Sequence, residues 1–298
     1  MKTLIAIIGP TGIGKTDLSI NIAKKLSTEI LSCDSRQVYK ELKIGTAVPS
    51  ESQLQKVTHH FVGHKSIHDY YNASMFEIEA LEILEILFRK YNQVIMTGGS
   101  GLYINAVCHG IDDLPGVDQE LRKELLQRLQ NEGVESLRMQ LKLIDPEYYK
   151  QADTRNPKRI LKALEVTLQT GKPYSSFLTN SKKERNFSII KIGLQRDRDE
   201  LYERINQRVD QMISEGLLEE AKSFYPFKYL NSLNTVGYKE LFDYFDGNIS
   251  LEKAIELIKR NSRHYAKRQI SWFGRDKGIH WFHPDDEDRI VEFINKSH

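Results

Sequence analysis

The sequence is poor in cysteine, in long apolar runs and in net charge. Its 298 residues include only two cysteines, Cys33 and Cys108, too few for a disulfide scaffold or a four-thiolate zinc site. Forty-three Lys and Arg against 41 Asp and Glu leave a formal net charge of +2. This balance excludes a strongly basic or acidic chain, but not a local basic face. With 40% hydrophobic and 28% charged residues, the chain can bury a sizeable core and is not a disordered protein.

No apolar stretch approaches the roughly 20 residues that a transmembrane helix needs. The N-terminal apolar run, residues 4–8, is followed at once by glycine and lacks the cleavage site of a signal peptide. We therefore expect a protein that does not enter a membrane and that works in the reducing cytoplasm. We also expect a monomer.

Short apolar runs alternate with helical patterns along the chain. The runs are 4–8, 29–33, 94–97, 189–194 and 279–282. Amphipathic stretches such as 15–26 and 74–88 lie between them. This alternation predicts an α/β fold, in which helices cover both faces of a parallel sheet.

One long stretch lacks strand patterns altogether. Residues 117–186 show only helical and polar patterns, at 119–131, 134–143 and 156–170. We therefore expect 117–186 to be a helical insertion domain within an α/β core made of 1–116 and 187–298. The last predicted helix, 251–272, is strongly basic toward its end.

Residues 9–16 match the phosphate-loop pattern G-x-x-x-x-G-K-[ST] without a gap. The motif stands between the first predicted strand and an amphipathic helix. Its glycines let backbone N–H groups point inward, and the helix dipole adds positive potential. Lys15 brings a full charge to a polyphosphate, and the Thr16 hydroxyl can hold Mg²⁺. The predicted ligand-binding residues are Gly9, Pro10, Thr11, Gly12, Ile13, Gly14, Lys15 and Thr16.

The acid that usually accompanies such a loop is missing from its expected place. In nucleotidases it ends a later strand, but here the third run leads into the glycine-rich turn 97–101. Those glycines allow either close approach of a ligand or a flexible turn. Asp34 follows the second run, whose strand we place beside the loop. Asp34 can take a proton from a nucleophile in the crevice or cap a turn, and both roles stay open.

Six segments, in order along the chain, resemble the signatures of the tRNA dimethylallyltransferases, also called tRNA isopentenyltransferases. They are 9–16, 34–40 (DSRQVYK), 97–103 (TGGSGLY), 153–166 (DTRNPKRILKALEV), 236–238 (VGY) and 267–272 (KRQISW). The resemblance agrees with a P-loop NTPase-like parallel-sheet core with a helical insertion. It implies transfer of a dimethylallyl group from dimethylallyl diphosphate to the exocyclic amine of the adenosine 3′-adjacent to the anticodon in tRNA. Gly12 departs from the pattern, since alanine is common at that position.

The resemblance assigns the general base to Asp34. Lys15, the loop amides and Mg²⁺ at Thr16 would stabilise the charge on the departing diphosphate. Arg204 and Arg208 lie four residues apart and would share a helix face. One of them can reach the diphosphate, and we name Arg208 as the catalytic candidate. The alternative is a solvated face paired with neighbouring acids.

We expect tRNA contacts in three parts of the chain. The resemblance implies a first group near the site, and the other two are basic stretches that can neutralise phosphates. One is a helical face of the insertion, expected to contact the anticodon stem. The other is the end of the last helix, where aromatic residues can also stack on bases. The candidates are Asp34, Ser35, Arg36, Gln37, Ser100, Arg122, Lys158, Arg159, Lys162, Lys267 and Arg268. For any one of these cations, an ordinary solvated surface role is the alternative.

Two other functions remain open. The first is a P-loop kinase, or a prenyltransferase that acts on a free nucleotide; the loop pattern alone also predicts ATP binding. The helical insertion and the basic last helix argue against this function, because a small substrate does not need them. The second is a non-catalytic RNA-binding module, against which the intact Lys15, Thr16 and Asp34 argue.

Overall fold

The structure, a computed structural model, describes residues 2–179 and 182–297. Within these ranges the strands form a six-stranded sheet in the order β3-β2-β4-β1-β5-β6, and each of its pairings is parallel. The predicted α/β fold is confirmed, and five strands coincide with the apolar runs. The sequence did not predict β3, which has two residues. The strands are β1 (Thr3–Ile8), β2 (Ile30–Cys33), β3 (His59–His60), β4 (Gln93–Gly98), β5 (Ser188–Leu194) and β6 (Ile279–Phe282).

Helices follow most of the strands, and many begin at a polar capping residue. Asn72, Asp197 and Ser250 each accept backbone N–H groups at the start of α3, α8 and α11, as expected for N-caps. No helix in the described ranges is long and apolar enough to span a bilayer. The helices are α1 (Lys15–Lys25), α2 (Glu51–Leu54), α3 (Ala73–Lys90), α4 (Gly101–His109), α5 (Gln119–Ile144), α6 (Pro146–Gln151), α7 (Pro157–Thr170), α8 (Arg198–Ser214), α9 (Leu217–Phe224), α10 (Tyr238–Phe245), α11 (Leu251–Phe273) and α12 (Glu287–Lys296), with short 3₁₀ turns η1 (Tyr174–Phe177), η2 (Tyr225–Phe227) and η3 (Asn231–Leu233).

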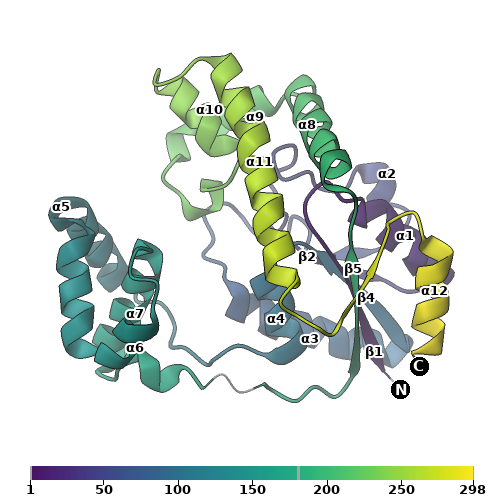
Figure 1. Cartoon of the computed structure of the whole chain (residues 1–298), viewed down its shortest axis with the longest axis horizontal. Coiled ribbons are helices and arrows are strands. Elements are labelled where there is room, and N and C mark those ends of the chain that lie inside the picture. The colour runs from purple at the N-terminus through teal and green to yellow at the C-terminus, as the bar shows by residue number, and fades with distance from the viewer. Residues whose placement is uncertain (1, 180–181, 298) are drawn as a thin grey trace. The chain divides into compact units, whose positions relative to one another are not determined.

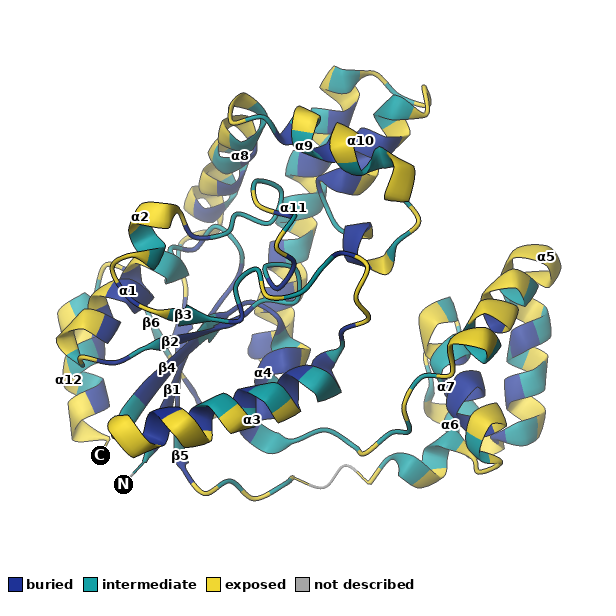
Figure 2. Cartoon of the chain, turned by 180° about the vertical axis from the view of Figure 1, so that it is seen from behind, coloured by how far each residue is buried: buried dark blue, intermediate teal, exposed yellow. Residues whose placement is uncertain are grey.

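The central strands β1, β2 and β4 are buried on both faces, which explains why they read as continuous apolar runs. Figure 1 shows α1 and α12 on one side of the sheet and α3 and α4 on the other. Ile5 and Ile7 of β1 pack in one cluster with residues of α1 and α12, such as Ile22 and Ile290. On the other side, the buried stripe of α3 faces the sheet (Figure 2).

The chain divides into two compact units, Met1–His109 with Glu184–His298, and Gly110–Lys183. The second unit contains α5, α6, α7 and η1 around a core of its own. Gly133 interrupts α5 with the non-helical angles φ 79° and ψ 176°, so α5 consists of two helices joined at a kink, which agrees with the two helical patterns expected there. The sequence placed the ends of this insertion at 117 and 186.

The strand order corrects one expectation. The sequence predicts the strand of Asp34 beside the phosphate loop, but β4 lies between β1 and β2. Gly98 at the end of β4 pairs with Ile8 on one side and Cys33 on the other. The phosphate loop and Asp34 therefore face each other across the glycine-rich turn that follows β4. All three segments leave the carboxyl edge of the sheet, where ligands bind in open α/β folds.

Candidate active site

The phosphate loop between β1 and α1 has the backbone conformation that its glycines predict. Gly12 and Gly14 have φ of 79° and 105°, a region that strains other residues. A Cβ atom on Gly12 would also lie 2.9 Å from Cγ1 of Ile205, which explains why this chain has glycine rather than alanine there. Gly14 begins α1 without a side-chain cap, so the N–H groups of the first turn are open to an anion.

The side chain of Lys15 folds back onto the start of the phosphate loop. Its ammonium group donates hydrogen bonds to the carbonyl oxygens of Gly9 (3.0 Å) and Pro10 (2.8 Å). Burial lowers the pKa of Lys15 to about 8, with Asp34 opposing that change and Arg208 adding to it. The lysine therefore stands in the electrostatic field of both residues, and an anion bound there would favour its charged form.

Gln269, on α11, joins the phosphate loop to the glycine-rich turn. Its Oε1 accepts the N–H of Thr11 at 2.9 Å, and its Nε2 donates to the carbonyl of Gly99 at 2.9 Å. The Thr11 N–H is thus engaged within the protein, which corrects the expectation that it binds phosphate. Sequence reasoning gave Gln269 no role. The available signal was a glutamine on a buried stripe that also holds Ala266 and Phe273.

The glycine-rich turn is packed tightly against the protein itself. A Cβ atom on Gly98 would lie 2.0 Å from the carbonyl oxygen of Cys33. On Gly101 it would lie 2.3 Å from Nε1 of Trp272. These glycines therefore serve close packing against β2 and α11, rather than the flexible turn that had remained an alternative.

The geometry of Asp34 is compatible with both of the roles that the sequence left open. Its Oδ1 accepts the N–H groups of Arg36 (2.9 Å) and Gln37 (3.4 Å), and so caps the turn that follows β2. Within residues 2–179 and 182–297, no hydrogen bond to Oδ2 is formed, and the side chain lines the cavity. Ser100 steadies the turn, because its Oγ accepts the N–H of Ser35 at 2.9 Å. One carboxylate oxygen is thus held by the backbone while the other remains available.

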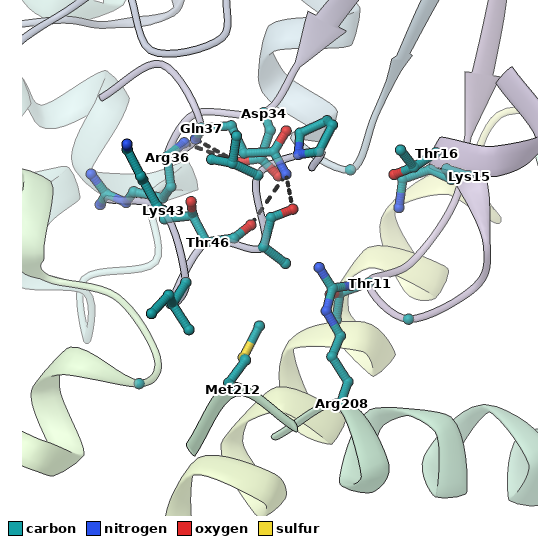
Figure 3. Close-up of a pocket in the computed structure, with 18 of the residues that line it drawn as sticks. Thr11, Lys15, Thr16, Asp34, Arg36, Gln37, Lys43, Thr46, Arg208 and Met212 are labelled. Carbon is teal, nitrogen blue, oxygen red and sulfur yellow. Dashed lines mark hydrogen bonds between the residues drawn. The ribbon is translucent and has the colours of Figure 1, made fainter. Parts of the chain in front are cut away.

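These segments enclose a cavity of about 1190 Å³, large enough for a small phosphate ester together with a purine. The loops after β1, β2 and β4 form one side of the cavity, and α8 and α11 contribute Met212 and Tyr265. Figure 3 shows Asp34, Gln37 and Thr46 grouped together, with Arg208 reaching toward Thr11.

The two arginines of α8 have different surroundings. Arg204 is exposed, and its Nε donates to the carbonyl of Gly12 at 3.1 Å. Arg208 is half-buried and has no hydrogen-bond or ion-pair partner in the described part of the chain, although it lines the cavity. Burial lowers its pKa, and the charge of Asp34 opposes this shift. An unpaired guanidinium facing a cavity indicates an anionic ligand.

The side chain of Gln37 is engaged within the protein. Its Nε2 donates to the carbonyls of Thr46 (3.1 Å) and Ala47 (3.0 Å), while its Oε1 accepts the hydroxyl of Ser32 (3.2 Å). Its neighbour Arg36 donates to the carbonyl of Asn234 at 3.4 Å. Gln37 therefore holds the chain around the cavity, a role that the resemblance did not suggest.

The second compact unit, Gly110–Lys183, is called the helical unit from here on. Its basic residues differ in their surroundings. Arg122 and Lys162 both bind the buried carboxylate of Glu165, at 3.0 and 3.1 Å. A buried acid needs such partners, so these two cations have a structural use that the sequence did not reveal. Lys158 and Arg159, at the start of α7, are exposed.

The basic residues near the end of α11 differ in whether they have partners. Lys259 pairs with Asp210 at 2.6 Å, and Arg263 donates to Oδ1 of Asn206 at 2.5 Å. Lys267 and Arg268 are exposed, and neither pairs with an acid in the ranges that the structure describes. The end of α11 therefore presents unpaired positive charge to solvent.

Comparison with known proteins identifies the family. A family model described as "IPP transferase" matches residues 37–276. The tRNA dimethylallyltransferase 1 of Bacteroides fragilis is 56% identical over 296 residues, which are 99% of this chain and 98% of that protein. The tRNA dimethylallyltransferase of Christiangramia forsetii is 54% identical over 292 residues, which are 98% of this chain and 97% of that protein.

Two solved structures share the fold over nearly the whole chain. The full-length tRNA isopentenylpyrophosphate transferase from Bacillus halodurans superposes with a TM-score of 0.72 at 37% identity, covering 99% of this chain and 96% of that one. A eukaryotic dimethylallyltransferase acting on tRNA superposes with a TM-score of 0.79 at 27% identity, covering 96% and 75%. With the phosphate loop and Asp34 facing one cavity, and with relatives this similar over this length, the chain belongs to the IPP transferase family.

Proposed function

We infer that the protein is a transferase that attaches a dimethylallyl group to tRNA, as the names of its relatives state for those proteins. We propose in addition that the donor is dimethylallyl diphosphate and the acceptor the exocyclic amine of the adenosine 3′-adjacent to the anticodon. One observation carries the proposal: a single cavity is lined by the phosphate loop, by Arg208 and by Asp34. The helix that follows the loop starts without a side-chain cap, Arg208 has no partner in the described chain, and only one carboxylate oxygen of Asp34 accepts hydrogen bonds there.

The acceptor needs a base because an aromatic exocyclic amine is a weak nucleophile. Its nitrogen forms a bond to the allylic carbon while the carbon–oxygen bond to diphosphate breaks, and the bonding pair leaves with the diphosphate. The free oxygen of Asp34 takes the amine proton as the new bond forms. Because Oδ1 is held by two backbone N–H groups, the free oxygen keeps a fixed direction. Such a base typically contributes about 10²–10⁴-fold in rate.

The leaving diphosphate carries increasing charge, and the cavity offers fixed positive groups to receive it. Lys15, Arg208 and the backbone N–H groups at the start of α1 line that part of the cavity. The Thr11 N–H is already occupied by Gln269 and adds nothing. Each preorganised donor of this kind is typically worth about 2.7–4 kcal/mol of transition-state stabilisation.

The donor groups in the cavity fit Mg²⁺ held jointly with substrate. No group of three His, Cys, Asp or Glu side chains in the described ranges is placed to hold a metal. Mg²⁺ commonly takes one or two protein oxygens and completes its shell with substrate phosphates and water. We propose that the hydroxyl of Thr16, the last residue of the phosphate-loop motif, supplies such an oxygen. The ion would neutralise charge on the diphosphate.

The RNA contacts are proposed from exposed charge. Lys158 and Arg159 on the helical unit, and Lys267 and Arg268 on α11, are exposed cations that suit phosphate binding. We propose that the helical unit contacts the anticodon stem. The monomeric state and the cytoplasmic location stay predictions.

The test incubates labelled dimethylallyl diphosphate and Mg²⁺ with bulk tRNA, or with AMP or ATP, and digests the RNA to nucleosides. Label on adenosine from tRNA supports the proposal, whereas label on the free nucleotide alone supports the alternative activity. Asp34→Asn keeps an oxygen to cap the turn but removes the base, so turnover should fall at least about 10²-fold with tRNA affinity retained. Asp118→Asn is the matched control, because Asp118 caps α5 through two N–H groups outside this cavity. Turnover preserved in Asp34→Asn would refute the assigned role.

A further inference from the structure

Glu220 of α9 does not line the cavity, yet it holds one of the cavity's walls. That wall is the loop 43–47, all of whose residues line the cavity. Oε2 of Glu220 accepts the N–H groups of Lys43 (3.0 Å) and Ile44 (2.8 Å), and Oε1 accepts the N–H of Gly45 (2.9 Å). Three consecutive backbone donors thus converge on one carboxylate, and bonds to a charged acceptor are the stronger kind.

Tyr238, the first residue of α10, completes this anchor. Its hydroxyl donates to Oε1 of Glu220 at 2.6 Å, and its side chain is fully buried. A Cβ atom on Gly45 would lie 2.7 Å from the tyrosine ring, so the loop lies directly against it. Ala47, at the end of the loop, has φ 48°, a left-handed conformation that surrounding contacts must maintain.

The far end of the loop is bonded to the turn of Asp34. The carbonyls of Thr46 and Ala47 accept both hydrogen bonds from Nε2 of Gln37. The backbone N–H of Gln37 in turn donates to Oδ1 of Asp34. Figure 3 shows Asp34, Gln37 and Thr46 side by side. A continuous path of hydrogen bonds and short loop segments therefore runs from Glu220 to the carboxylate that faces the substrate cavity.

We propose that Glu220 is a positioning residue for prenyl transfer, acting through loop 43–47 and the Gln37 side chain on the direction of Asp34. The inference rests on the proposed function, because it takes Asp34 as the base. Glu220 itself touches no substrate. Its effect should therefore fall on turnover, whereas binding of tRNA and of the diphosphate should change little.

The test variant is Glu220→Gln, which keeps the shape of the side chain but replaces one acceptor oxygen by an amide that cannot accept. We expect kcat to fall about tenfold to a hundredfold, the range for losing bonds to a charged group. The KM for dimethylallyl diphosphate and the Kd for tRNA should stay within about twofold of the wild type. Glu219→Gln is the matched control, since Glu219 is exposed, carries the same charge and lies one residue away. It should behave as wild type.

Hydrogen exchange measured by mass spectrometry separates positioning from simple support of the fold. In Glu220→Gln, exchange should rise in segments 34–37 and 43–47 together, with the helical unit unchanged. Faster exchange at 43–47 alone, with kcat at the wild-type value, overturns the proposal. A kcat loss matched by equal losses in tRNA and diphosphate binding also overturns it, because that pattern indicates general damage.

A second variant keeps the test decisive if Glu220→Gln folds poorly. Tyr238→Phe removes one bond to Glu220 but leaves the three loop N–H groups in place, so it should reproduce the effect more weakly. Gln37→Leu cuts the path on its other side. If the path is real, the double variant Glu220→Gln with Gln37→Leu loses little more kcat than the worse single variant; fully multiplicative losses contradict it. A wild-type protein that prenylates no tRNA refutes the proposed function, and the exchange measurements then decide the path alone.

Discussion

The backbone N–H of Thr11 donates a 2.9 Å hydrogen bond to the side chain of Gln269, 258 positions later in the chain. The same glutamine donates to Gly99, whose neighbour Ser100 holds the turn of Asp34 through Ser35. Helix α11 therefore fixes the separation between the phosphate loop and the turn of Asp34, the two segments that we propose bind the diphosphate and take the proton. Catalysis by positioning depends on such separations, since a displacement of about 1 Å can cost about 10²-fold in rate.

Replacing Gln269 with leucine should impair both stability and turnover. The variant keeps the volume of the side chain but leaves the Thr11 N–H and the Gly99 carbonyl without partners, at about 1–3 kcal/mol for each buried group. Thermal unfolding should shift down by several degrees, and kcat/KM should fall at least tenfold. Gln130→Leu, at an exposed position of α5, is the control. An unchanged kcat/KM in Gln269→Leu would show that the separation of the two loops is set elsewhere.

The two arginines of α8 should differ sharply in function. Arg208 has no partner in the described chain and faces the cavity, so Arg208→Gln should lower kcat about 10²–10³-fold, as for loss of a preorganised donor. Arg204 bonds the carbonyl of Gly12, so Arg204→Gln should have a smaller effect. Steady-state kinetics with dimethylallyl diphosphate as the varied substrate measures both. Equal losses in the two variants would mean that the arginines act as a general positive surface.

The sequence predicts well the features that depend on residues close together in the chain. It predicts poorly which distant segments lie side by side in the fold. The phosphate loop could be predicted because residues 9–16 carry the whole motif, and the five longer strands because burial on both faces leaves continuous apolar runs. The order of the strands in the sheet could not be predicted, because the periodicity of a sequence does not show which strands are neighbours. That is why the position of Asp34 relative to the loop was wrong by one strand.

Side-chain roles in the site show the same division. The residue type of Asp34 suggested a base or a cap, and only the geometry shows that one oxygen caps the turn while the other stays available for the proposed base. Arg122 and Lys162 looked like free cations until the buried Glu165 was placed between them. Gln269 and Glu220 escaped notice because each acts through backbone groups far away in sequence. Partners of this kind have no local pattern to reveal them.

Diphosphate binding should weaken as the pH rises above about 8. Burial lowers the pKa of Lys15 to about 8, so the free protein holds the charged form below that pH and loses it above. Only the charged form of Lys15 attracts the anion, so binding above this pH requires the uptake of one proton. The affinity for the diphosphate therefore falls by up to about tenfold per pH unit. Calorimetric titration with dimethylallyl diphosphate from pH 7 to 9.5 measures the effect. Lys15→Arg should bind more weakly but with a flat profile, and a flat wild-type profile would contradict the assignment.

Binding of tRNA should depend on salt through the exposed cations at the end of α11. Lys267→Ala with Arg268→Ala removes two unpaired charges, so the slope of log K against log salt concentration should fall by about 1.4–1.8. The control, Lys259→Ala with Arg263→Ala, changes the net charge equally on the same helix. Those two side chains, however, already bond Asp210 and Asn206, so the slope should change much less. Equal changes in the two double variants would mean that tRNA senses the total charge of the helix, and that its last turns make no defined phosphate contacts.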